Sequence, residues 1–223
     1  MSVNAHYRRQ IRALAAPFGV SAAKVDPGQG VAPADTHGVT ERDEIMIDML
    51  TLKVNDAAAQ VLGMIGALRY TAAPGDLTTG LQERIDCGLR RRGSVLTWAD
   101  SVGVAEGAPS IFNDLTAWEC ADTSFHIEDF VQVDVAIVDD APVISDGDQR
   151  TLLLHGFAFA LQFSRLVYAL SAPSPVRCIV AANDTNATFR FHQIRQGESW
   201  NRPDLDAYRE DKMIVLDIEP ATA

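Results

Sequence analysis

The fold class is decided by the stretch Val176-Arg-Cys-Ile-Val-Ala-Ala-Asn-Asp-Thr-Asn-Ala-Thr-Phe-Arg-Phe-His-Gln-Ile-Arg195. Its two apolar runs, 176–182 and 187–195, flank the tetrad Asn183-Asp-Thr-Asn186, whose residues favour a tight turn. Polar and apolar side chains alternate through the second run, as expected for a strand with one buried face. A third run, 212–218, follows after a polar loop. These features predict an antiparallel meander at the C-terminal end of the chain.

A long helix is expected immediately before this meander. It begins at Ser145 or Asp148, continues to Leu170, and is closed by Pro173 and Pro175. The window 152–170 is strongly apolar, but a membrane-spanning helix would bury Gln162 and Arg165 in hydrocarbon, at a cost of several kcal/mol. A helix buried in a protein core is therefore the better interpretation, and the chain is expected to need no membrane.

The N-terminal part has helical spacing of apolar residues. Helices are predicted over 4–16, 40–70 and 77–92, with a Gly/Pro-rich loop over 17–39, a short helix near 95–98 and a half-buried strand over 130–138. The sequence thus predicts an α+β fold, in which a helical N-terminal part precedes a small, mainly antiparallel sheet with one long packed helix. One domain is expected over 1–223, consisting of a helical part (1–93) and a C-terminal part (94–223).

Composition limits the class of protein. With 223 residues, 47% hydrophobic and 22% charged, the chain can bury a substantial core and is not expected to be disordered. Cys87, Cys120 and Cys178 form no CxxC pair, so neither a disulfide scaffold nor a zinc knuckle is indicated. The arginines near the start are followed by no apolar segment of the kind a secretory leader contains. These features predict a protein of the reducing cytoplasm.

The net charge of −11 comes from one segment of the chain. No Lys or Arg lies between Arg92 and Arg150, whereas the rest of the chain holds 18 acidic and 19 basic residues. The twelve acids of this segment are Asp100, Glu106, Asp114, Glu119, Asp122, Glu128, Asp129, Asp134, Asp139, Asp140, Asp146 and Asp148. Three interpretations remain open: solvated loop and helix-end residues, a surface for a basic protein partner, or a divalent-cation site.

Nucleic acid is disfavoured as a partner, because phosphates would meet carboxylates on such a surface. A protein with a basic surface is the partner that this charge favours. The residues expected to bind it are Glu119, Asp122, Glu128, Asp129, Asp139, Asp140 and Asp146. Asp148 is expected to cap the long helix instead.

No catalytic signature is present in the sequence. It contains no GxSxG, GxxxxGK[ST] or GxGxxG motif, and the acids near Asp140 lack the spacing of an EF-hand. Catalytic residues, cofactors and bound metals are therefore not expected. The alternative is a metal-dependent hydrolase that uses His126, Glu128 and nearby aspartates, because alternate residues of an extended segment point to the same side.

A resemblance adds to this interpretation. The segments Thr188–Trp200, Leu205–Tyr208 and Met213–Asp217 resemble the closing segments of bacterial polymorphic-toxin immunity proteins. The resemblance implies a cytosolic binder that neutralises a toxin, and it carries over no catalytic residue. The leading hypothesis is therefore a non-enzymatic, immunity-like or antitoxin-like protein that covers a basic partner with its acidic surface.

Overall fold

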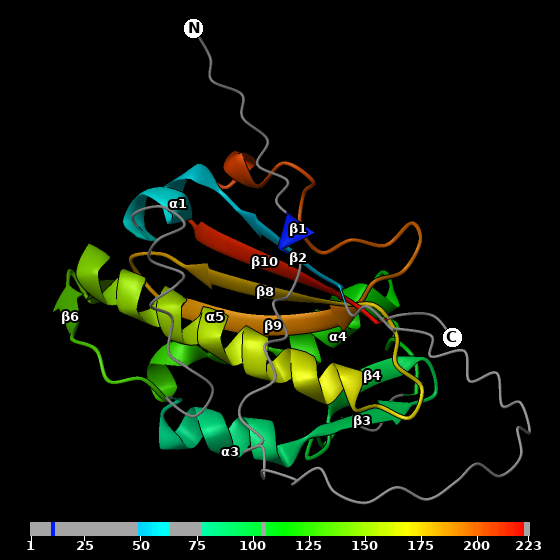
Figure 1. The fold of residues 1–223 in the computed structure, drawn as a ribbon. Coiled ribbons are helices and arrows are strands. Elements are labelled where there is room, and N and C mark those ends of the chain that lie inside the picture. The colour runs from blue at the N-terminus through cyan, green and yellow to red at the C-terminus, as the bar shows by residue number, and fades with distance from the viewer. Residues whose placement is uncertain (1–9, 12–48, 63–76, 104–105, 221–223) are drawn as a thin grey trace, which may run out of the picture.

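The structure, a computed structural model, describes residues 10–11, 49–62, 77–103 and 106–220. Its centre is a six-stranded antiparallel sheet in the order β1-β2-β10-β8-β9-β5 (Figure 1). The strands are β1 (Gln10–Ile11), β2 (Met49–Val54), β10 (Lys212–Glu219), β8 (Val176–Ala182), β9 (Ala187–Gln193) and β5 (Phe125–His126). The C-terminal meander thus forms the middle of the sheet.

Helix α5 (Asp146–Tyr168) lies across one face of the sheet, where it packs against β8, β9 and β10 (Figure 1). Ser145 caps its first turn by accepting a hydrogen bond from the Asp148 backbone N–H. Gly156 allows α5 to lie close to β8, because a Cβ at this position would be 2.5 Å from Cγ1 of Val180. The residues of α5 that face the sheet are buried and form the main hydrophobic core.

An aromatic cluster joins a second, smaller sheet to this core. The second sheet is a hairpin of β3 (Leu89–Arg92) and β4 (Val95–Trp98), which follows α3 (Thr79–Cys87). Trp98 is 1% exposed and its ring packs edge-on against Phe163 and Phe191. Burial of such large rings contributes several kcal/mol, so Trp98 fixes the small hairpin on the main sheet.

The remaining elements are short. They are α1 (Asp56–Leu62), α4 (Leu115–Thr123), the 3-10 helices η1 (Ile127–Asp129) and η2 (Leu205–Ala207), and a third sheet of β6 (Val135–Val138) and β7 (Ala141–Ile144). The sheet face opposite α5 carries a smaller apolar cluster, in which Leu205 packs on Ile179, Met213 and Val215. Both faces of the central strands are therefore covered.

The α+β class and the C-terminal half agree with the sequence analysis. The long helix, the β8–β9 hairpin and the last strand occur where they were expected. Among the helices of the described ranges, none combines the length and apolarity that a membrane crossing requires.

The expected helical N-terminal arrangement is not confirmed. Gln10–Ile11 and Met49–Val54 are strands, and in the described part of the range 40–70 the only helical residues are those of α1. In β2, Leu50, Leu52 and Val54 contact the core while the residues between them face the other side. Apolar residues at these positions also fit part of a helical pattern, so the sequence alone does not separate the two periods here. The rest of 1–48 and 63–76 lies outside the described residues.

Three further expectations were wrong. The helix predicted to Arg92 ends at Cys87, because Gly88 takes a φ of 76° and turns the chain into β3. Residues 95–98 form a strand that is buried at all four positions, not a helix. The half-buried strand expected over 130–138 is limited to Val135–Val138, and all four residues are exposed.

Candidate functional site

The β6–β7 hairpin forms an acidic tip on an exposed arm. Its two turn residues, Asp139 and Asp140, have φ values of 51° and 62°, as in a type I′ turn, whose backbone twist matches that of the flanking strands. Aspartate tolerates this left-handed conformation better than most residues. Both are exposed, and neither forms a hydrogen bond or ion pair with another described residue. The two carboxylates are therefore free to meet a partner.

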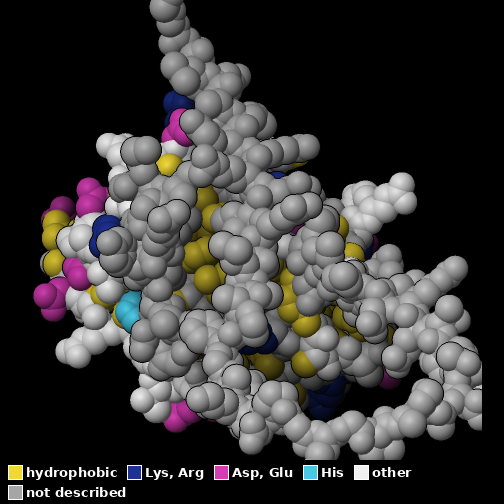
Figure 2. Space-filling model, in the orientation of Figure 1, with side chains coloured by type: hydrophobic (Ala, Val, Ile, Leu, Met, Phe, Trp, Pro, Cys, Tyr) yellow, Lys and Arg dark blue, Asp and Glu magenta, His cyan; other side chains and the backbone are white. Residues whose placement is uncertain are grey.

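The arm behind this tip is apolar. The exposed fractions are 42% for Val135, 68% for Ile137, 52% for Val138 and 36% for Val143. In the hairpin register Val138 pairs with Ala141 and Ala136 with Val143, so these four residues form one apolar face of the ribbon, and each of them is exposed. Figure 2 shows hydrophobic and acidic side chains side by side at the edge of the molecule where Figure 1 places β6. Exposed apolar groups beside charges are typical of a protein interface.

The base of the arm is firmly held. Ile144 is 2% exposed, and its backbone N–H donates to the carbonyl oxygen of Asp184 over 2.7 Å. The Gln149 side chain donates to the Ile144 carbonyl oxygen, also over 2.7 Å. Ser145 then begins α5 directly. The arm is thus attached to the core at one end and exposed along its length.

Proline limits what can pair with the arm. Ile137 lies opposite Pro142, one step from the closing pair Val138–Ala141. In a two-residue hairpin the closing pair exchanges hydrogen bonds, so Pro142 belongs to a pair whose backbone groups face outward. Because proline has no N–H, the outer edge of β7 is a poor template for another strand. The outer edge of β6 carries no such block.

The acids at the start of α5 are partly engaged. Asp146 forms an ion pair of 3.2 Å with Lys212 of β10, although its side chain is 83% exposed. Asp148 accepts a hydrogen bond from the Ser145 hydroxyl and lies in the first turn of α5, where the helix dipole favours an acid. Asp129 is exposed in η1 and has no partner among the described residues. Of the acids expected to bind a partner, Asp129, Asp139, Asp140 and Asp146 do lie on the surface.

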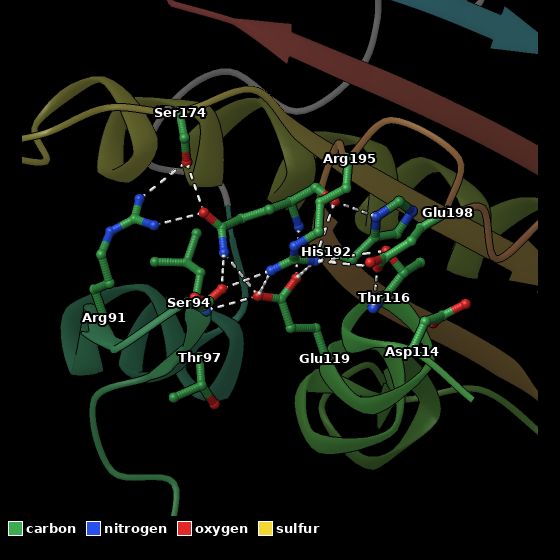
Figure 3. A network of polar contacts seen from close by, with 12 residues as sticks. Arg91, Ser94, Thr97, Asp114, Thr116, Glu119, Ser174, His192, Arg195 and Glu198 are labelled. Atoms are coloured by element: carbon green, nitrogen blue, oxygen red, sulfur yellow. Dashed lines mark hydrogen bonds and ion pairs between the residues drawn. The ribbon is translucent and has the colours of Figure 1, made fainter. Parts of the chain in front are cut away.

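Glu119 does not belong to that surface. Its exposed fraction is 0%, and its carboxylate forms a 2.6 Å ion pair with Arg195 (Figure 3). The same carboxylate accepts hydrogen bonds from the backbone N–H groups of Leu96 and Gln193, each over 2.7 Å, and from the Gln193 side chain over 2.8 Å. A partner cannot reach it, so its expected binding role is withdrawn.

Asp122 and Glu128 are half-buried and serve internal contacts. Asp122 accepts hydrogen bonds from the hydroxyls of Thr97 and Ser101, the latter over 2.8 Å. Glu128 accepts a 3.0 Å bond from the backbone N–H of Ala187. These two acids therefore hold β4, the loop after it and β9 in place.

Two of these internal acids, Glu119 and Glu128, accept hydrogen bonds from the outer edge of β9. Strand β5 pairs with it only at Phe189 and Thr188. Beyond that pairing, the outward N–H groups of Ala187, Phe191 and Gln193 donate to the side chains of Glu128, Thr123 and Glu119, respectively. Side chains thus complete the edge that a neighbouring strand would otherwise satisfy.

A sequence signal for this arrangement existed in α4. Thr116, Glu119, Cys120 and Thr123 are buried, at the spacing i, i+3, i+4 and i+7 that defines one face of a helix. An acid at such a position indicates a buried carboxylate with an internal partner. Arg195 supplies that partner from a distant part of the sequence, which local patterns do not show.

The alternative site at His126 and Glu128 is present only as a pair. Nδ1 of His126 lies 3.1 Å from Oε1 of Glu128. The described residues hold no group of three or more His, Cys, Asp or Glu side chains that could bind a metal ion. The other Glu128 oxygen is already used by β9. The pair on its own gives no argument for hydrolysis.

The cysteines and the remaining histidines do not form a reactive centre. The three cysteines are free thiols, and burial raises the pKa of Cys120 to about 12, so its thiolate is disfavoured. His155 of α5 and His192 of β9 both have a pKa lowered by burial, which keeps them neutral. Cys87 lies beside the Asp100 carboxylate, but burial and that neighbour both raise the pKa of its thiol, which disfavours the thiolate.

Comparison with known proteins gives a family and no functional relative. No curated protein and no solved structure matches the chain. The model of the family described as "Uncharacterized protein PM0498 family" matches residues 75–223, which include α3, α4, α5, the acidic hairpin and most of the main sheet. This range is more than half of the chain, and the chain belongs to that family.

Proposed function

We propose that this chain is a non-enzymatic, cytoplasmic protein of the immunity type, which binds a basic partner protein through the β6–β7 hairpin. One observation carries the proposal: an apolar, solvent-exposed arm ends in two adjacent carboxylates that have no partner among the described residues. The exposed apolar side chains of the arm add little to the stability of the free protein, because they bury little surface. The arm is therefore best explained by what it binds.

The charge of the arm supports a basic protein as the partner. Asp134, Asp139 and Asp140 belong to the hairpin or its approach, and no Lys or Arg occurs between Arg92 and Arg150 to neutralise them locally. Lys212 pairs with Asp146 at the base of the arm and also donates to the Gln149 side chain. Such a field attracts a basic surface and raises the rate of association, while the apolar groups behind it are buried after contact.

The apolar and acidic groups have separable roles. Charges at the rim of an interface act mainly on the association rate, whereas buried apolar anchors act mainly on dissociation. Asp139 and Asp140 are therefore expected to speed encounter, and Ile137, exposed by 68%, is expected to hold the complex together. The proposed binding surface does not include Glu119, Asp122 and Glu128, because these acids form hydrogen bonds inside the protein.

The experiment uses the purified product of the reading frame next to the one that encodes this chain, which is where an immunity protein's target is encoded. The double variant Asp139→Asn/Asp140→Asn should slow association by roughly tenfold at low salt, since electrostatic steering is worth about 10 to 10³ in rate. Asparagine also tolerates positive φ, so the turn should be preserved. Ile137→Ser should leave association unchanged and accelerate dissociation, as measured by surface plasmon resonance.

The matched control is Glu83→Gln/Glu210→Gln, which removes the same charge from exposed positions on α3 and before β10. It should bind as the parent does. If the neighbouring product does not bind the parent chain and is not neutralised by it in co-expressing cells, the immunity proposal is wrong. If binding occurs and neither hairpin variant alters it, the hairpin is not the interface.

A further inference from the structure

A hollow lies on the sheet face opposite α5. Its floor is formed by Ile179 and Ala181 of β8 and by Met213 of β10, and its volume is about 200 Å³. A cavity of about 150 Å³ holds a molecule of the size of benzene, so one small ligand fits. The loop from 194 to 211 forms the wall, where Trp200 and Tyr208 contribute aromatic rings.

Arg190 presents unused hydrogen-bond donors in this hollow. Its guanidinium lies 5.3 Å from the centre of the Trp200 ring and donates one hydrogen bond, to the Thr188 hydroxyl over 3.1 Å. A guanidinium has five N–H groups, and no carboxylate among the described residues lies within 4.0 Å of this one. Arg177 and Arg195, by contrast, both have carboxylate partners. Burial lowers the pKa of Arg190, and the nearby Asp211 charge offsets this only in part.

Unused acceptors line the same hollow. Asn201 is 7% exposed, and its Oδ1 atom has no hydrogen-bond partner among the described residues, although its Nδ2 donates to the Arg202 carbonyl oxygen. The Asp211 carboxylate accepts one 2.9 Å bond from the Asn183 side chain and has no cation within 4.0 Å in the described ranges. An unsatisfied buried acceptor costs about 1–3 kcal/mol, and a bound donor would remove that cost.

We propose that this hollow binds a free α-amino acid with an apolar side chain, with its carboxylate on Arg190 and its ammonium group on Asp211 and Asn201. A guanidinium and a carboxylate that line one cavity without pairing with each other match a ligand that carries both charges. A ligand with a carboxylate alone would give no donor to Asp211 or to Oδ1 of Asn201. A ligand with an amine alone would give no acceptor to Arg190. The apolar floor then receives the side chain.

Isothermal titration calorimetry of the full chain tests the assignment with L-leucine and L-phenylalanine. The matched probes are 4-methylpentanoate and 3-phenylpropanoate, which lack the amino group, and 3-methylbutylamine and 2-phenylethylamine, which lack the carboxylate. At least one amino acid should bind at a single site, and both of its analogues should bind at least tenfold more weakly, which is about 1.4 kcal/mol. Absence of saturable binding by both amino acids overturns the proposal, as does equal binding of either analogue.

The variants locate the site. Arg190→Gln and Asp211→Asn should each weaken amino-acid binding by at least tenfold, whereas Arg209→Gln, an exposed arginine of the same loop that does not line the hollow, should not. Circular dichroism establishes that each variant is folded. Should Arg190→Gln fail to fold, Asp211→Asn still decides, since its amide oxygen can keep the hydrogen bond from Asn183. Binding that persists in folded Asp211→Asn shows that the ammonium group is not recognised there and overturns the assignment.

Discussion

Glu119 is a carboxylate that receives hydrogen bonds from three distant parts of the chain. Leu96 belongs to β4, Gln193 to β9, and Arg195 to the loop after β9. A fully buried charge is costly to desolvate, and here each oxygen atom is compensated by several donors. Removing the carboxylate would leave two backbone N–H groups without their acceptor and would take from the half-buried Arg195 its nearest carboxylate partner. Glu119 is therefore a structural residue.

Glu119→Ala is expected to lower the free energy of unfolding by about 3–5 kcal/mol, the usual cost of breaking a buried ion pair from one side. Urea denaturation followed by circular dichroism measures it. Glu106→Ala, at an exposed acid of the same charge-rich segment, should stay within about 0.5 kcal/mol of the parent. A loss below about 1 kcal/mol for Glu119→Ala would mean that Arg195 and the backbone donors find other acceptors.

The role of individual acids could be predicted only in part. The sequence shows twelve acids without a local base, and for Asp139 and Asp140 this correctly predicts exposed carboxylates. For Glu119 the same reasoning is wrong, because its cation comes from a residue 76 positions away. The sequence gives no signal for Arg190 and Asn201, which line the hollow, because a donor or acceptor is unpaired only in relation to the strands and loops around it. The order of charged residues along the sequence does not show which of them form ion pairs in the folded protein.

At the scale of elements, the outer edge of β9 is completed by side chains of α4 and η1 in place of a full strand. Thr123 is the clearest case, because its buried hydroxyl accepts from the Phe191 N–H over 3.0 Å and donates to the Phe191 carbonyl oxygen over 2.8 Å. One hydroxyl thus replaces both hydrogen bonds that a neighbouring strand residue would make. This requires α4 to lie directly against the edge.

Thr123→Val keeps the shape of the side chain and removes both hydrogen bonds. It should destabilise the protein by about 1–3 kcal/mol, the cost of leaving buried backbone groups unsatisfied. Thr123→Ser retains the hydroxyl and should lose less, which separates hydrogen bonding from packing. Thermal and urea unfolding of both variants provide the measurement. Equal losses for valine and serine would assign the effect to packing alone.

The elements that could be predicted share one property. Helix α5 and strands β8, β9 and β10 are each at least seven residues long, and each carries a clear apolar signal over that length: helical spacing in α5, alternation in β9, and nearly continuous apolar runs in β8 and β10. Strands β3, β4 and β6 have four residues each, which is too short to separate a period of 2 from one of 3.6. Their conformation depends on partners: Trp98 is held by rings of α5 and β9, which the local sequence does not contain.

At the scale of the whole molecule, the net charge of −11 is distributed unevenly. Several acids have partners, as Asp100 has Arg84, Asp146 has Lys212, and Glu119 has Arg195. Asp134, Asp139 and Asp140 have none among the described residues and lie on or beside one arm. A four-residue strand is about 13 Å long, so these carboxylates repel one another within the Debye length of about 30 Å at 0.01 M salt. At 0.15 M the Debye length falls to about 8 Å, and much of this repulsion is screened.

The triple variant Asp134→Asn/Asp139→Asn/Asp140→Asn should therefore be more stable than the parent at 0.01 M salt, and the gain should shrink at 0.15 M. Urea is the appropriate denaturant because it is uncharged and leaves the ionic strength unchanged. The control Glu83→Gln/Glu106→Gln/Glu210→Gln removes the same charge from exposed positions on other elements and should gain less. Equal, salt-independent changes in both variants would show that the arm carries no concentrated repulsion. If the triple variant is more stable and also associates more slowly with the basic partner, the three carboxylates lower the stability of the free protein and increase its rate of association. Such a trade between stability and function is expected of a binding site.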